Sequence, residues 1–76
     1  MRSWIITLRN EQKMTAQEVA DKLGVSGAYY SMIENGKRQK SMDITLVSKL
    51  AEIFGVSIQH IVNLERDYQS TVGNIA

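Results

Sequence analysis

The sequence TAQEVADKLGVSGAYYSMIENG, residues 15–36, decides the fold of this chain. It contains two stretches whose apolar residues recur with helical spacing, separated by the short turn Gly24-Val25-Ser26. Glycine after a helix favours the left-handed conformation that ends it, and serine is a common cap at the start of the next helix. The stretch therefore predicts two short helices set at a steep angle to each other.

The first of these helices has sequence signals at both ends. Thr15 and Glu18 have the spacing of a capping box, in which each side chain bonds a free backbone N–H of the other residue. Val19, Ala20 and Leu23 fall on one side and predict the face that packs into a core. This helix is expected to end at the glycine of the turn.

The second helix has an unusual outer face. Tyr30 and Ile33 define its inner side, whereas Ala28 and Met32 point the opposite way and Gly27 lies on the flank. A helix that only packs against a core usually presents Lys and Glu to solvent. Small residues with few charges instead favour close approach to another surface, and a helix in this arrangement can enter the major groove of DNA.

Glu34 lies close to the inner face of the same helix, beside Tyr30, so we expect it to be partly buried. A buried carboxylate without a partner is strongly destabilising. The best candidate for that partner is Arg9, on the helix predicted for residues 3–12. The sequence therefore predicts that an Arg9–Glu34 ion pair joins these two helices.

Periodic apolar residues predict three more helices, over residues 3–12, 43–54 and 57–66. The fold class is therefore expected to be all-α, a compact five-helix bundle. A chain of 76 residues can form one core. We expect one domain over residues 1–66, while residues 67–76 lack a sustained pattern and are predicted to be a tail that is frayed or ordered by a dimer partner.

The composition excludes several classes of protein. The chain has no cysteine, which excludes disulfides and thiolate metal sites. No apolar run reaches the length of a membrane span, and residues 1–6 lack a signal-peptide core. His60 is the only histidine and has no companion ligand, and no serine stands in a nucleophile motif. We therefore expect a soluble, cytoplasmic protein that is not an enzyme and uses no metal or cofactor.

The charges of the chain are unevenly distributed, although the net charge is only +1. Residues 1–40 carry seven Lys or Arg against four acids, a balance of +3, and residues 41–76 carry two against four, a balance of −2. Three of the cations, Lys37, Arg38 and Lys40, directly follow the second helix of the motif. This pattern favours a face that meets phosphate, and from charge alone an uneven solvated surface explains it equally well.

Short motifs with the spacing of a known family run through most of the chain. They are Leu8-Arg9, Met14-Thr15, Glu18-Val19-Ala20, Leu23-Gly24-Val25-Ser26, Ile33-Glu34-Asn35-Gly36-Lys37-Arg38, Lys49-Leu50-Ala51 and Phe54-Gly55-Val56-Ser57. Together they resemble the phage repressor and Cro-like helix-turn-helix family, also called the xenobiotic response element family. The resemblance covers residues 3–64 and implies a lambda-repressor-like DNA-binding domain, with its helix-turn-helix at about residues 15–36.

The resemblance also assigns roles to individual residues. In this family the third helix lies in the major groove of an operator, and an Arg–Glu pair at the positions of Arg9 and Glu34 is a family feature. The residues at the family's base-reading positions are Gly27, Ala28 and Met32, and we also expect the hydroxyl of Ser31 to read bases. The residues at the family's phosphate-contacting positions are Thr15, Gln17, Asn35, Lys37, Arg38 and Lys40. Beyond the resemblance, we also expect Ser26 and Tyr29 to contact phosphates.

Departures from the family pattern affect what the third helix can read. The family usually has Gln where Ala16 stands, with Gln17 now following it, and Gln, Arg or Lys is common where Gly27 stands. The loop over residues 39–45 lacks the usual Pro and is slightly longer. Gly27 and Ala28 cannot make the bidentate hydrogen bonds by which Arg reads guanine or Gln reads adenine. We therefore hypothesise A·T-rich half-sites, with phosphate contacts and DNA shape contributing more than in relatives.

The resemblance implies a sequence-specific regulator of transcription that binds double-stranded DNA, more often a repressor than an activator. A single module contacts few base pairs, so a homodimer on a pseudo-palindromic operator is expected. Ile61, Leu64, Tyr68 and Val72 are near-periodic and form the candidate dimer surface, although core packing explains them equally well. No small-molecule effector is expected, and a regulatory protein partner is possible. The alternative function is a protein-interaction module, such as an antirepressor, adaptor or antitoxin, that uses the same fold.

Overall fold

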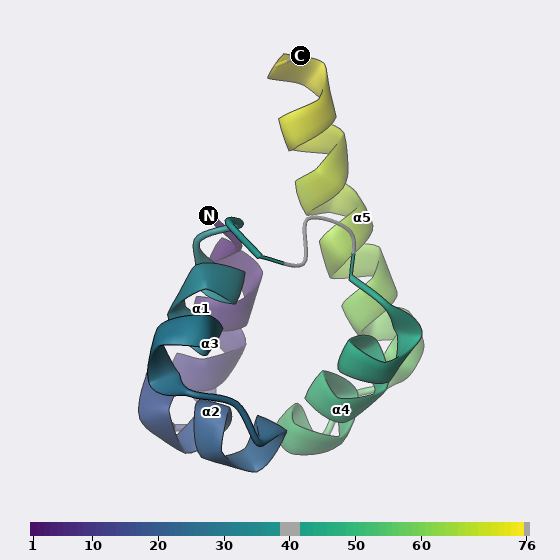
Figure 1. The fold of residues 1–76 in the computed structure, drawn as a ribbon. Helices are drawn as coiled ribbons and strands as arrows, with labels where there is room; N and C mark the ends of the chain where they lie inside the picture. Colours follow the sequence, from purple (N-terminus) through teal and green to yellow (C-terminus); the bar gives the residue numbers. More distant parts are fainter. Residues whose placement is uncertain (39–41, 76) are drawn as a thin grey trace.

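The computed structural model describes residues 1–38 and 42–75, and the side chains of these residues as far as Thr71. Within them the chain forms five α-helices, which confirms the predicted all-α class. Their bounds are α1 (Ser3–Glu11), α2 (Ala16–Leu23), α3 (Gly27–Glu34), α4 (Ile44–Phe54) and α5 (Ile58–Ile75). α1, α2 and α3 lie on one side of the molecule, and α4 and α5 lie on the other (Figure 1).

A polar side chain caps the start of four of these helices. Thr15, Ser26, Asp43 and Ser57 each accept a hydrogen bond from a backbone N–H in the first turn, at 2.8–3.1 Å. Such a cap stabilises a helix by about 1 kcal/mol because it satisfies an N–H that has no partner within the helix. Since Asp43 and Ser57 are caps, α4 and α5 begin at the residues that follow them.

The turn between α2 and α3 depends on Gly24. This residue has φ 78°, in the left-handed region that residues with a Cβ rarely adopt. Its N–H donates to the carbonyl of Asp21 at 3.2 Å, and the N–H of Val25 donates to the carbonyl of Ala20 at 3.1 Å. These bonds close the end of α2 and turn the chain directly into the cap of α3.

The apolar faces of the helices meet in one core. α2 packs against both α3 and α4, α1 packs against α3, and α4 packs against α5. The inner faces predicted for the second and third helices are buried as expected. The buried apolar residues are Trp4, Ile5, Leu8, Val19, Ala20, Leu23, Tyr30, Ile33, Val47, Leu50, Ala51, Phe54 and Ile61.

α5 is longer than the sequence pattern indicated. It continues past Arg66 to Ile75, so the predicted end of this helix is wrong. Tyr68, beyond the predicted stop, packs against the core, and Thr71 Oγ1 donates to the carbonyl of Asp67 at 3.1 Å. The last turns extend beyond the rest of the molecule (Figure 1). The division into a domain over residues 1–66 and a tail over residues 67–76 stays a prediction.

The candidate dimer surface also needs one correction. Ile61 is fully buried in the core of its own chain, so it is not available to a partner and its assignment to the dimer surface is wrong. Leu64 and Tyr68 are half-buried and keep part of their surface exposed. The side chain of Val72 lies outside the described residues.

Among the described residues, no single helix is long and apolar enough to cross a bilayer. α4 and residues 58–71 of α5 reach the necessary length and hydropathy only together, as a pair bent by 116°.

Candidate nucleic-acid interface

The inner faces of α2 and α3 fix which side of α3 is free. Leu23 on α2 and Tyr30 and Ile33 on α3 are buried in the common core. Because side chains on a helix of this pitch repeat every 3.6 residues, burying Tyr30 and Ile33 turns the opposite side of α3 outward. The structure therefore leaves one long side of α3 without a covering element among the described residues.

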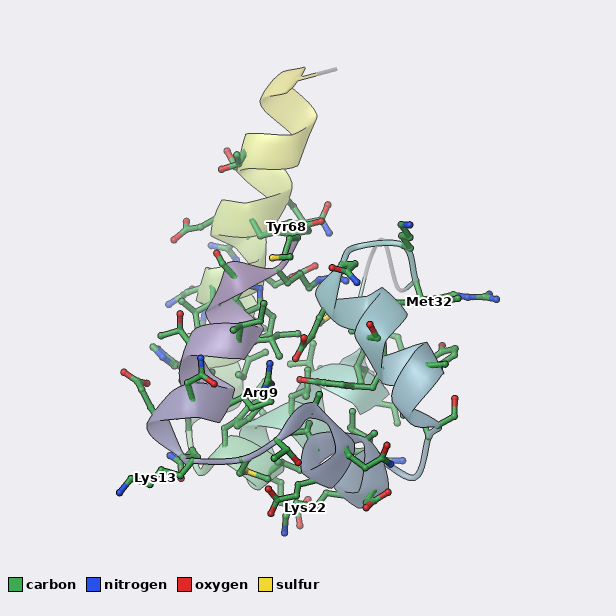
Figure 2. All side chains as sticks on the ribbon, turned by 90° about the vertical axis from the view of Figure 1, so that its left-hand side faces the viewer. Arg9, Lys13, Lys22, Met32 and Tyr68 are labelled. Atoms are coloured by element: carbon green, nitrogen blue, oxygen red, sulfur yellow. The ribbon has the colours of Figure 1, made fainter. Side chains whose placement is uncertain are left out.

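The predicted base-reading residues lie together on this outer side of α3. Ala28, Ser31 and Met32 are exposed, and Gly27 at the helix start is half-buried. Met32 keeps 40% of its surface accessible, and it lies on the side of α3 away from α1 (Figure 2). The outer side of α3 thus carries no charge, and at its N-terminal end its side chains are small.

Two of the predicted phosphate-contacting residues, Thr15 and Ser26, are helix caps. Each hydroxyl oxygen accepts a backbone hydrogen bond at 3.1 Å, which leaves its O–H free to donate outward. Asn35, at the end of α3, places its amide nitrogen 3.5 Å from the Ser31 hydroxyl. Gln17 is exposed on α2, and its amide nitrogen donates to Asp21 Oδ1 at 2.9 Å.

The remaining predicted phosphate contacts follow α3 or lie on its flank. Lys37 and Arg38 are exposed, and their backbone N–H groups both donate to the carbonyl of Met32, at 2.8 and 3.2 Å. The Arg38 guanidinium lies 5.8 Å from the centre of the half-buried Tyr29 ring. The backbone bonds hold both cations next to the outer side of α3. Lys40 lies outside the described residues.

The predicted ion pair between α1 and α3 is present. Arg9 Nε donates to Glu34 Oε2 at 2.9 Å, and Arg9 Nη1 donates to the Met14 carbonyl at 3.3 Å. Arg9 points from α1 into the body of the molecule (Figure 2). Burial raises the pKa of the neighbouring Tyr30 well above its ordinary value, and the Glu34 carboxylate raises it further, so Tyr30 stays neutral. The pair therefore ties α1 to the end of the candidate reading helix.

The Arg9–Glu34 pair should contribute to stability as a unit. We expect Arg9→Ala and Glu34→Ala each to destabilise the chain, and the double variant to lose less than the sum by about 0.5–3 kcal/mol. Urea denaturation of the four proteins measures this coupling. Glu11→Ala, which removes an exposed acid from the same helix, is the matched control and should cost no more than about 0.5 kcal/mol. Fully additive losses would contradict the assignment.

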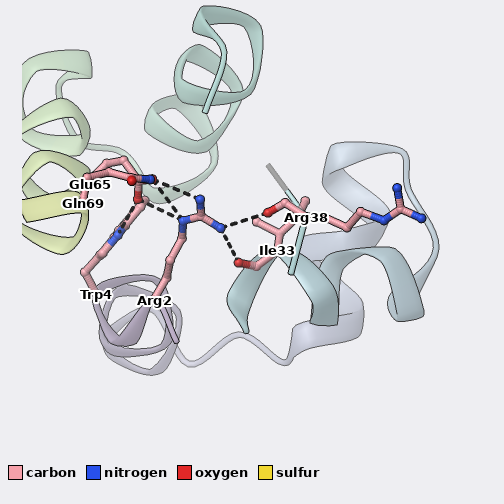
Figure 3. Close-up of polar contacts among 6 residues, drawn as sticks. All are labelled: Arg2, Trp4, Ile33, Arg38, Glu65 and Gln69. Carbon is pink, nitrogen blue, oxygen red and sulfur yellow. Dashed lines mark hydrogen bonds and ion pairs between the residues drawn. The ribbon is translucent and has the colours of Figure 1, made fainter. Parts of the chain in front are cut away.

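A second ion pair, which the sequence analysis did not predict, supports the segment after α3. The side chain of Arg2 is fully buried, and its Nε lies 2.9 Å from Glu65 Oε1. Its Nη1 donates to the carbonyls of Ile33 and Arg38, at 2.6 and 3.2 Å (Figure 3). Arg2 thereby links α5 to the end of α3 and to the backbone of Arg38. The guanidinium of Arg38 itself points away from this cluster (Figure 3).

Glu65 is the centre of this cluster. Besides Arg2, it accepts hydrogen bonds from Trp4 Nε1 at 3.1 Å and from Gln69 Nε2 at 2.8 Å (Figure 3). A buried carboxylate is tolerated when each oxygen is bonded in this way. Glu65 follows the buried Ile61 at helical spacing, the same signal that identified Glu34, so the sequence did hold a clue to its burial.

The described residues contain no group of three or more His, Cys, Asp or Glu that could hold a metal ion. The side chains on the outer side of α3 are small or apolar, and those beside it are amides, hydroxyls and cations. These groups donate hydrogen bonds and balance negative charge, which suits the grooves and phosphates of a nucleic acid.

Comparison with known proteins gives the class of this chain. The sequence model of the helix-turn-helix family matches residues 5–61, and the chain belongs to this family of phage repressor and Cro-like DNA-binding regulators. It is 40% identical over 55 residues to a Bacillus subtilis (strain 168) protein named as an uncharacterized HTH-type transcriptional regulator, YqaF. That match covers 72% of this chain and 70% of the relative. No solved structure matches the chain significantly.

Proposed function

We propose that this protein is a transcriptional repressor of the cytoplasm that binds a pseudo-palindromic operator as a homodimer. The observation that carries this proposal is the outer side of α3, which is uncharged, is covered by none of the described residues and is bordered by Lys37 and Arg38. A major groove admits one α-helix, and cations beside that helix meet the phosphates along the groove edge. The class of the chain as a DNA-binding regulator agrees with this geometry.

In the proposed complex, the residues on α3 read bases mainly by apolar contact. Ala28 and Met32 lie against thymine methyl groups, and Ser31 supplies a hydroxyl. Thr15 and Ser26 donate their free hydroxyl hydrogens to phosphates at the start of α2 and α3. Lys37, Arg38 and Lys40, with Asn35 and Tyr29, hold the phosphates at the other end of α3.

The dimer is the second part of the proposal. One copy presents one reading helix, and two copies related by a two-fold axis place two such helices about one turn of DNA apart. The exposed parts of Leu64 and Tyr68 and the last turns of α5 form the proposed contact between copies. Sedimentation of the protein with and without duplex DNA measures this state, and a complex with one copy per operator would contradict it.

Selection of binding sites from random duplex DNA tests the proposed function. We expect a pseudo-palindromic consensus with A·T-rich half-sites, because Ala28 and Met32 favour thymine and the outer side of α3 has no Arg or Lys to read guanine. A consensus dominated by guanines at the central contacts would contradict this account of base reading. Failure to enrich any sequence would contradict the proposed function itself.

A further inference from the structure

At the start of α3, a side chain from α2 fills the space beside Gly27. A Cβ placed on Gly27 would lie 2.6 Å from Gln17 Oε1, closer than real Cβ contacts, and 3.5 Å from the amide carbon of the same side chain. The amide of Gln17 therefore lies where the side chain of residue 27 would begin. Any larger residue at position 27 would have to displace it.

The amide of Gln17 is held in this place and remains able to bind. Its nitrogen donates to Asp21 Oδ1 at 2.9 Å, which fixes the side chain along α2. An amide nitrogen carries two hydrogens, so one N–H is still available, and Oε1 accepts no hydrogen bond from any residue that the structure describes. The side chain is exposed. Gln17 thus presents one donor and one acceptor beside the first turn of α3.

We propose that Gln17 is a base-reading residue that replaces the side chain missing at Gly27, and that the base it reads is adenine. A Gln amide matches adenine in the major groove, because its oxygen accepts from N6 and its nitrogen donates to N7. Asp21 orients the amide, and Gly27 leaves the room through which it reaches the groove. This inference rests on the proposed function, since it requires α3 to lie in a major groove.

The inference changes the role expected for Gln17 from a phosphate contact to a base contact. These two roles have different consequences for binding. Loss of a phosphate contact weakens binding to all sequences about equally, whereas loss of a base contact removes the preference at one base pair. The sequence preference of variants therefore separates the two roles.

The test compares the wild-type protein with Gln17→Ala and Gly27→Ala. Gln17→Ala removes the side-chain amide. Gly27→Ala keeps Gln17 but places a methyl group in the space that the Gln17 amide occupies. Binding is measured to the selected operator and to operators in which each conserved A·T pair is replaced in turn. At the A·T pair that Gln17 reads, the wild type should bind the selected operator roughly 5- to 150-fold more tightly than the operator in which that pair is replaced. Each single variant should reduce this ratio of affinities to about twofold or less. The double variant should show the same ratio as the single variants, because both substitutions remove the same contact.

Gln59→Ala is the matched control. Gln59 lies on α5 and its amide nitrogen donates to Asn63 Oδ1 at 2.9 Å, the same spacing and distance as in the Gln17–Asp21 bond. This variant should keep the full preference. If Gln17→Ala weakens binding to all operators equally, or leaves binding unchanged, the inference is overturned and the proposed function stands. If the wild type shows no sequence preference at all, both are overturned.

Discussion

Glu65→Ala should lower the free energy of unfolding by about 3–5 kcal/mol, because it leaves the fully buried guanidinium of Arg2 without its carboxylate. The variant also removes the acceptor of Trp4 Nε1. A domain of this length has a total stability of only about 4–11 kcal/mol. We therefore expect the variant to be partly unfolded near its working temperature, and urea denaturation followed by circular dichroism measures the loss.

The control for this prediction is Glu52→Ala, which removes an exposed acid from α4. It should change stability by no more than about 0.5 kcal/mol. Arg2→Ala should be nearly as damaging as Glu65→Ala, because it leaves the carboxylate buried with only the Trp4 and Gln69 donors. A loss below about 1 kcal/mol for both variants would contradict the view that this cluster holds α5 against the end of α3.

Replacing Lys37 and Arg38 together by alanine should weaken operator binding by on the order of 10³-fold at physiological salt. Each phosphate contact contributes roughly fivefold under these conditions, and the proposed dimer loses four of them. The backbone bonds of both residues to the Met32 carbonyl, and that of the Arg38 carbonyl to Arg2, are kept by alanine. The loss should therefore appear in binding and not in stability. Affinity is measured by titration of labelled operator.

A charge-matched control exists on the same chain. Lys22 and Lys49 are exposed and line a groove on α2 and α4 that includes none of the predicted base-reading residues on α3. Figure 2 shows Lys22 at the lower end of the molecule, well below Met32. Replacing both lysines by alanine removes the same total charge but should reduce affinity only a few-fold. Equal losses in the two double variants would mean that net charge, and not a defined phosphate contact, determines binding.

Local sequence signals predicted the fold well because they act within one or two turns of a helix. The capping box of Thr15 and Glu18 and the turn at Gly24 depend only on neighbours in the chain, and the structure contains both. The Arg9–Glu34 pair was also predictable, because a carboxylate on the inner side of a helix requires a cation from the next packed element.

Features that depend on the relative placement of distant segments were not predicted. Arg2 and Glu65 are 63 positions apart, and their contact exists only because the start of α1 and the middle of α5 meet. The position of the Gln17 side chain beside Gly27 depends on the angle between α2 and α3. The periodicity of apolar residues predicts the faces of a helix but not this angle. The continuation of α5 past Arg66 depends on Tyr68 packing against the core rather than on a local pattern.

The salt dependence of operator binding tests the central claim, that α3 and the cations after it bind DNA, most directly. With Lys37, Arg38 and Lys40 from each copy, the proposed dimer neutralises about six phosphates with cations, so log K should fall against log salt with a slope near −5. The Lys37→Ala and Arg38→Ala double variant should give a slope of about −2. A wild-type slope near zero would contradict the account and would favour a protein-interaction module built on the same fold.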